Sequence, residues 1–369
     1  MRVAARREAG TGGERRVAIT PDTVAQYKTA GLTVTVEPGA GEASGHADAD
    51  YTAAGATVAA VDLAKVDVLA HVSPISAALA KKLRAGAITV GLAAPGSDPD
   101  ATAALRDRTI TTFALELLPR ISRAQSMDAL TSQALVAGYR CVLEAAIRFP
   151  RFFPLYMTAA GTIPPARALV LGAGVAGLQA IATAKRLGAK VSAYDVRAAS
   201  ADEVGSMGAT FINIDLDTAG DAAGGYAKEL AADRSKRQQE LLAPHIADAD
   251  VIITTAAIPG RPAPKLITAA ALKGMRPGSV IVDLAAESGG NVEGSKPGED
   301  VLVKVTGGTV TIVGMSDAAS RMPVDASRLL AKNIANFVAL LTTDGKVAPD
   351  FEDEVVAGAC MTRDGKDAR

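Results

Sequence analysis

The sequence has few of the residues from which metal, thiol and nucleophile sites are built. It contains two cysteines, three histidines and no tryptophan among 369 residues. Cys141 and Cys360 lie far apart and form no CxxC motif, which argues against a disulfide framework and a thiolate metal site. The motifs HExxH, GxSxG and GxxxxGK[ST] are also missing, so no metal site and no activated nucleophile are expected.

An excess of positive charge and a long apolar run are missing too. Lysine plus arginine number 39 against 40 for aspartate plus glutamate, so no net charge steers the chain to nucleic acid or to an anionic bilayer. No apolar run approaches the roughly 20 residues that cross a bilayer. The sequence therefore predicts no nucleic-acid partner and no membrane span of its own.

The chain does contain a glycine-rich turn between an apolar run at residues 168–171 and a helical pattern at residues 175–187. This arrangement is typical of a dinucleotide-binding turn, in which glycines permit a tight turn and close approach to a pyrophosphate. The helix N-terminus adds free N–H groups and the positive end of a dipole. The candidate contacts are Gly172, Gly174, Val175, Ala176 and Gly177.

The next apolar run, residues 190–194, ends in Asp195. A second strand of a dinucleotide-binding domain delivers an acid to the adenosine ribose at about this position. A carboxylate suits the 2′-hydroxyl of NAD and repels the 2′-phosphate of NADP. Asp195, Val196 and Arg197 are therefore candidate contacts to NAD(H), although a base two residues after the acid leaves the role of Arg197 open.

Strand and helix patterns alternate along the whole chain, which favours parallel α/β sheets over hairpin sheets. A helix at residues 126–148 connects two halves, and a helix at residues 324–341 returns to cover the first. The sequence thus predicts two doubly wound parallel-sheet, Rossmann-like α/β domains joined by a long helix. The expected domains are residues 1–128 with 322–369, and residues 129–321. The further strands are expected at residues 3–5, 33–36, 66–72, 88–92, 110–114, 210–214, 251–255, 279–284 and 309–313.

A polar segment, residues 119–128, links the last expected strand of the first domain to the connecting helix. It contains two arginines, a glutamine and an aspartate. One interpretation is a solvated loop in which Ser126 caps the helix. However, this segment and nearly the whole chain resemble the NAD(H)-binding component of proton-translocating nicotinamide nucleotide transhydrogenases. The other segments that carry the resemblance are residues 16–21, 157–162, 177–189, 224–228, 352–354 and 362–365.

The resemblance implies that Arg120, Gln125 and Asp128 reach the nicotinamide end of the bound nucleotide, and these residues are the catalytic candidates. A loop hydroxyl that is usually serine in the family is Thr131 here. Ile121 and Ser122 complete the expected contacts of this loop.

A lid is also expected from the resemblance. The Gly- and Ala-rich residues 218–225 have the flexibility of such a loop, with Gly225 as a contact and Tyr226 near the tip as a further catalytic candidate. Gly260 follows the expected strand at residues 251–255, at the edge where α/β sheets bind ligands.

The implied function is hydride transfer between NAD(H) on this chain and NADP(H) on a partner component. Direct transfer between two nicotinamides releases no proton from the reacting carbons, so the lack of an obvious general base is consistent with it. The resemblance further implies a homodimer, an NADP(H)-binding component and a proton-conducting membrane component. It places the chain in the cytoplasm, peripheral on the inner face of the plasma membrane through these partners.

Two alternatives stay open. Alanine dehydrogenase has a similar fold and N-terminal pattern, and it uses a lysine and a histidine in its first domain. Here the counterpart of the lysine falls at or near His71, and residues 90–94 contain no histidine. A non-catalytic NAD sensor would carry the same glycine turn without hydride chemistry.

Overall fold

The computed structural model describes residues 1–8, 13–214, 227–257 and 262–368. The chain forms two compact units, one of Met1–Gln133 with Ala319–Arg369 and one of Ala134–Ala318. The domain boundaries expected from the sequence, after residues 128 and 321, stay a prediction. Within the described residues, no helix has both the length and the apolar character needed to cross a membrane.

The first unit is built on a sheet with the strand order β19-β18-β6-β5-β4-β1-β2-β3. Its strands from β6 to β3 are parallel, and the order β2-β1-β4-β5-β6 is that of flavodoxin-like doubly wound sheets. The antiparallel pairing of β18 with β6 was not expected from the sequence. The strands are β1 (Arg2–Ala5), β2 (Thr33–Val36), β3 (Thr57–Val58), β4 (Val68–His71), β5 (Ile88–Gly91), β6 (Thr111–Ala114), β18 (Cys360–Arg363) and β19 (Lys366–Asp367).

Helices cover both faces of this sheet, as the two hydrophobic clusters on either side of it require. Helix α1 begins at Pro21 with Thr20 at its N-cap position, and the chain turns at Gly31, whose φ of +75° suits glycine. The helices are α1 (Pro21–Thr29), α2 (Asp48–Ala54), α3 (Ala77–Ala80), α4 (Pro99–Asp107), α10 (Pro323–Leu340) and α11 (Glu354–Ala359), with a small hairpin of β16 (Thr342–Thr343) and β17 (Lys346–Val347).

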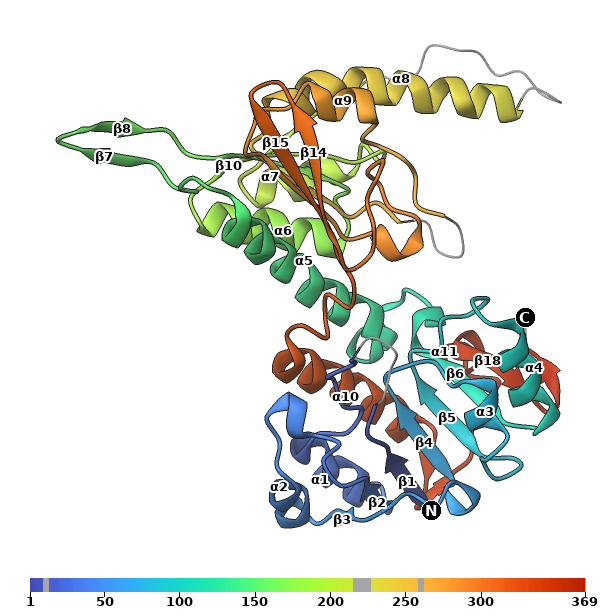
Figure 1. Ribbon diagram of the computed structural model, residues 1–369. Helices are drawn as coiled ribbons and strands as arrows, with labels where there is room; N and C mark the ends of the chain where they lie inside the picture. Colours follow the sequence, from blue (N-terminus) through green and yellow to red (C-terminus); the bar gives the residue numbers. More distant parts are fainter. Residues whose placement is uncertain (9–12, 215–226, 258–261, 369) are drawn as a thin grey trace. The chain divides into compact units, whose positions relative to one another are not determined.

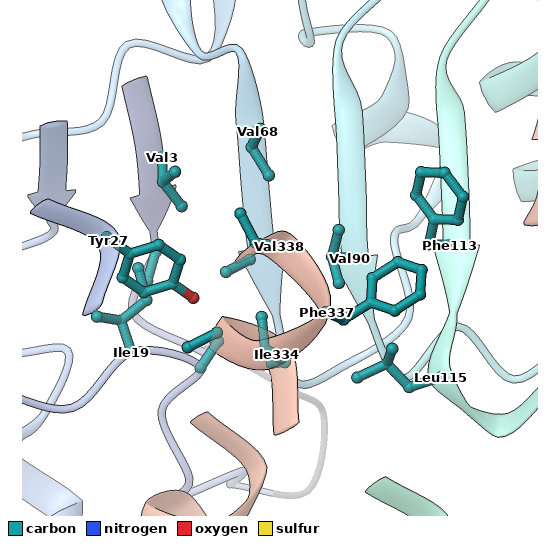
Figure 2. Packing of buried hydrophobic residues seen from close by; sticks show 14 of the residues in the cluster. Val3, Ile19, Tyr27, Val68, Val90, Phe113, Leu115, Ile334, Phe337 and Val338 are labelled. Carbon is teal, nitrogen blue, oxygen red and sulfur yellow. The ribbon is translucent and has the colours of Figure 1, made fainter. Parts of the chain in front are cut away.

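Helix α10 returns from the second unit to cover the first sheet, as the apolar stripe of residues 324–341 predicts. Its buried Ile334, Phe337 and Val338 face the strands that carry Val68 and Val90 (Figure 2). The Phe337 ring also meets the Phe113 ring edge to face, with 5.1 Å between the ring centroids. The first unit therefore depends on a helix that lies far along the sequence, after the whole of the second unit.

The second unit is built on a sheet with the order β11-β10-β9-β12-β13-β15-β14. Its six parallel strands follow the 3-2-1-4-5-6 order of dinucleotide-binding domains, so the expected Rossmann-like fold is confirmed. Strand β14, antiparallel at the edge, was not expected from the sequence. The strands are β9 (Arg167–Leu171), β10 (Lys190–Tyr194), β11 (Thr210–Phe211), β12 (Val251–Thr254), β13 (Val280–Asp283), β14 (Asp300–Val305) and β15 (Gly308–Gly314).

Successive residues of the central strand β9 point to opposite cores. Ala168 and Val170 pack with α5 and α6, whereas Leu169 and Leu171 pack with α8 and α9. Burial on both faces explains why this strand is apolar throughout and does not alternate. The helices are α5 (Ala129–Arg148), α6 (Val175–Arg186), α7 (Ser200–Ser206), α8 (Ala227–Asp248) and α9 (Ala269–Lys273). A hairpin of β7 (Tyr156–Thr158) and β8 (Gly161–Ile163) extends from this unit (Figure 1).

The start of α5 corrects the expectation that Ser126 caps this helix. The segment Ser122–Met127 forms 3-10 helix, and α5 begins only at Ala129. The Asp128 carboxylate accepts a hydrogen bond from the backbone N–H of Thr131 at 2.8 Å, the geometry of an N-cap. Ser126 lies inside the 3-10 helix, whereas Asp128 directly precedes α5 and is therefore in the capping position.

The packing of α10 predicts that Phe337→Ala lowers the free energy of unfolding by about 3–5 kcal/mol, because it leaves a cavity against Phe113. Leu329→Ala, on the same helix but 38% exposed, should cost less than about 1 kcal/mol. Urea titrations of the two variants test this. Equal losses would show that α10 does not hold the core of the first unit.

Candidate dinucleotide-binding site

The glycine-rich turn lies where β9 ends between its neighbours β10 and β12. This is the point where strand order reverses, which is where open α/β sheets bind ligands. Gly172 has a φ of +105°, and a Cβ placed on it would lie 2.7 Å from the Thr255 hydroxyl. That hydroxyl donates to the Gly172 carbonyl at 3.0 Å. The turn is therefore closed against the end of β12, and glycine is required at its first position.

The other two glycines of the turn serve different purposes. A Cβ on Gly177 would overlap the carbonyl oxygen of Gly172, so the missing side chain lets α6 close onto the turn. A Cβ on Gly174 would meet no other part of the described chain within 4 Å. The space beside Gly174 is open at the N-terminus of α6, where backbone N–H groups lack helical partners. Such a site favours an anionic group such as a pyrophosphate.

Asp195 follows β10 and reaches back to this turn. Its Oδ2 atom accepts a hydrogen bond from the Ala173 N–H at 2.7 Å, and its carboxylate forms a two-point ion pair with the Arg197 guanidinium. Burial raises the pKa of the Asp195 carboxyl, but the hydrogen bonds from Arg197 and Ala173 outweigh it and hold this pKa below its ordinary value. Asp195 is therefore ionised at neutral pH. Val196, next to it, is exposed.

A buried amide, not expected from the sequence, holds the chain segment that follows β12. Asn291 accepts from the N–H of Ala256 at 3.1 Å and donates to its carbonyl at 2.8 Å, and it also donates to Pro264 at 2.8 Å. The buried Asp283 accepts from the Thr254 hydroxyl and from the Asn291 N–H. These bonds fix the chain that leaves β12. The only sequence signal was a polar residue after two glycines, which is not specific.

The polar loop of the first unit is anchored by the C-terminal segment. The Ser126 carbonyl accepts hydrogen bonds from the side-chain amides of Asn333 and Asn336, at 3.0 and 2.9 Å. Arg123 makes a two-point ion pair with Asp353, at 2.6 and 2.7 Å. The loop is thus held from two sides within the first unit.

Of the residues expected in this loop, the structure brings Asp128 and Thr131 together. The Thr131 hydroxyl donates to Asp128 Oδ2 at 2.6 Å, beside the N-cap bond to Oδ1. The side chains of Arg120, Ser122 and Gln125 are exposed, and the side chain of Ile121 is half-buried at the edge of the core. Each is therefore positioned on a fixed loop, either at its surface or against the core.

The remaining candidates lie outside the described residues: Gly225, Tyr226 and Gly260, together with the expected lid at residues 218–225. In the described part of the chain, no group of three or more His, Cys, Asp or Glu side chains could hold a metal ion.

His71, at or near which the counterpart of the alanine dehydrogenase lysine is expected, is buried in the first unit. Its Nδ1 atom lies 2.9 Å from the Ser73 carbonyl oxygen, and burial lowers the pKa of the imidazole to about 4. His71 is therefore neutral at physiological pH and is not presented to solvent.

The geometry of the turn predicts that Gly177→Ala lowers the free energy of unfolding by about 1–3 kcal/mol, because the new methyl group overlaps a backbone carbonyl. Gly174→Ala is the matched control. It should cost less than about 1 kcal/mol, since it loses only N-cap preference. Urea unfolding of both variants measures the difference, and equal stabilities would contradict the closed turn.

Comparison with known proteins places this geometry in a family. Family models described as alanine dehydrogenase/PNT match residues 4–137 with the N-terminal domain and residues 141–368 with the C-terminal domain. An NAD(P) transhydrogenase subunit alpha chain of Rhodospirillum rubrum is 48% identical over 369 residues, covering 96% of this chain and 94% of the relative. The alanine dehydrogenase of Mycobacterium tuberculosis is 33% identical over 77% of this chain and 72% of its own length.

A solved structure agrees with these matches. The transhydrogenase of Sinorhizobium meliloti has a TM-score of 0.88 and 43% identity, and the match covers 100% of both chains. The resemblance to the transhydrogenase component, with alanine dehydrogenase as a relative, is therefore confirmed. The chain belongs to the alanine dehydrogenase/PNT family.

Proposed function

We propose that this chain is the NAD(H)-binding subunit of a proton-translocating transhydrogenase. It passes hydride between NAD(H) bound on this chain and NADP(H) bound on a partner component. The observation that carries the proposal is the pairing of an open glycine turn at the N-terminus of α6 with an ionised carboxylate, Asp195, at the end of β10. The transhydrogenase relatives at high coverage support the reaction.

The proposed nucleotide contacts divide between pyrophosphate, ribose and nicotinamide. The turn cradles the pyrophosphate with backbone N–H groups, and Asp195 meets the ribose, with Val196 and Arg197 beside it. The polar loop orients the nicotinamide through Arg120, Gln125 and Asp128, with Ile121, Ser122 and Thr131 as neighbours. Gly225, Tyr226 and Gly260 are further proposed contacts outside the described residues. The full set of proposed turn residues is Gly172, Gly174, Val175, Ala176 and Gly177.

The chemistry needs alignment more than acid–base groups. When the nicotinamides are bound, the reduced ring supplies the hydride, and no substrate proton has to be removed. The protein must hold the rings in register and exclude water. Positioning of this kind is worth roughly 7–11 kcal/mol of the barrier. An anchored loop with exposed polar side chains is suited to that task.

Partners follow from the proposed reaction. The chain requires an NADP(H)-binding component and a proton-conducting membrane component, and it would sit in the cytoplasm on the inner face of the plasma membrane through them. We also propose a homodimer. Exposed apolar side chains on and beside the β7–β8 hairpin support an interface between proteins. They are Phe152, Leu155, Tyr156, Met157 and Ile163.

Alanine dehydrogenase is the second candidate because a relative of that name matches the chain. The burial and neutrality of His71 disfavour it, since this side chain is not placed to take a proton from an amino acid.

The purified chain is expected to bind NADH and to form no NADH from NAD⁺ and L-alanine. Adding a purified NADP(H)-binding component of this family, without a membrane, should start hydride transfer between the two nucleotides. Absorbance of a nicotinamide analogue follows the reaction. Alanine-dependent NADH formation by the chain alone would establish the alternative enzyme, and binding without transfer would identify a sensor.

Asp128 tests whether the loop orients the ring or only caps a helix. The Asp128 carboxylate has roughly four acceptor positions, and Thr131 occupies two of them. The other two are left for a nicotinamide amide. Asp128→Asn keeps a good N-cap residue but should slow hydride transfer about 10- to 100-fold, the effect of one charge-assisted contact.

The control is Asp128→Ala, which should also lower the free energy of unfolding by about 1 kcal/mol through the lost cap. Stopped-flow rates, NADH titrations and urea unfolding separate the effects. A wild-type transfer rate in Asp128→Asn would leave this residue with a capping role alone.

A further inference from the structure

The carboxylate of Asp195 is fully occupied by donors from the chain itself. Oδ1 accepts from the backbone N–H of Arg197 and from its Nε, both at 2.9 Å. Oδ2 accepts from the Ala173 N–H at 2.7 Å and from Arg197 Nη2 at 3.1 Å. An ionised carboxylate offers roughly four lone-pair positions. These four bonds use them all.

The four donors differ in how easily they can leave. The N–H groups of Ala173 and Arg197 belong to the backbone, at the glycine turn and just after β10. The other two belong to the Arg197 side chain, which is 58% exposed while that of Asp195 is 9% exposed. Only the guanidinium can move away without moving the backbone. Its departure frees two lone pairs, the number that the two hydroxyls of a ribose need.

We propose that Arg197 is a specificity-determining residue that competes with the nucleotide ribose for Asp195. The ribose diol binds by displacing the guanidinium, so the chain's own ion pair lowers its affinity for NAD(H). The inference rests on the proposed function, in which NAD(H) binds at this turn.

The same pairing bears on the choice between NAD(H) and NADP(H). While Arg197 is paired with Asp195, its charge is neutralised and offers little attraction to a 2′-phosphate. Removing the Asp195 carboxylate would leave the guanidinium unpaired beside the ribose position, where charge-assisted hydrogen bonds to a phosphate are favourable. Asp195 therefore excludes NADP(H) in two ways, by its own charge and by holding Arg197.

Equilibrium titrations of the full chain with NADH test the competition. Arg197→Met keeps the apolar stem and removes the charge, and it should bind NADH about two- to fivefold more tightly, which is the equivalent of one exposed ion pair. Arg197→Lys has one charged donor group in place of a two-point guanidinium, so its NADH affinity should lie between those of Arg197→Met and wild type. Arg237→Met is the control, because Arg237 is 57% exposed and paired with Glu240 on α8. The NADH affinity of this variant should equal that of wild type.

A double-mutant cycle with NADPH supplies the second measurement. Asp195→Ala should bind NADH more weakly and NADPH more tightly than wild type, and Asp195→Ala/Arg197→Met should lose the NADPH gain. Unchanged or weaker NADH binding by Arg197→Met, with Asp195→Ala still impaired, would overturn the competition and leave the proposed function intact. Wild-type NADH affinity in Asp195→Ala would instead remove the nucleotide from this turn, and the proposed function with it.

Discussion

The position of the Gly172 carbonyl group is the constraint on which the proposed nucleotide site depends. The hydroxyl of Thr255, the residue directly after β12, donates a hydrogen bond to it, and the first turn of α6 lies close to it where Gly177 has no side chain. This closure fixes the direction in which α6 starts and brings the Ala173 N–H to Asp195. The open N-terminus of α6, the Asp195 carboxylate and the end of β12 meet at this turn, so the proposed pyrophosphate and ribose contacts lie side by side.

In the first unit, the polar loop at residues 119–128 is fixed by side-chain hydrogen bonds and an ion pair to segments far away in the sequence. Asn333 and Asn336 of α10 hold the Ser126 carbonyl, and Asp353 holds Arg123. The helix that supplies the core, α10, therefore also fixes the loop proposed to orient the nicotinamide. Because α10 both packs in the core and holds the loop, a substitution that shifts this helix in the core is expected to shift the loop as well.

The sequence predicted much of this architecture because it has strong local signals. Strand β2 falls on the expected residues 33–36, and α6 starts at Val175 after the glycine turn. Strand β14 was not predicted although its burial alternates along the strand, because the alternation of helix and strand patterns favoured parallel strands separated by helices. The bond from Ala173 to Asp195 and the bonds of the Asn291 amide could not be predicted, since they join chain segments 22 to 35 residues apart. The three bonds from Arg197 to Asp195 depend on side-chain conformation, which the sequence does not show.

The discontinuity of the first unit sets an order for its formation during synthesis. Residues 134–318 complete the second unit before α10 has been made. At about 5–20 residues per second, roughly 10–40 s separate the synthesis of residue 133 from that of residue 340. Throughout that interval one face of the first sheet, with Val68, Val90 and Phe113 on it, lacks its covering helix. The apolar side chains on this face therefore lack the contacts of α10 until the end of synthesis, whereas the second unit is formed by one continuous segment.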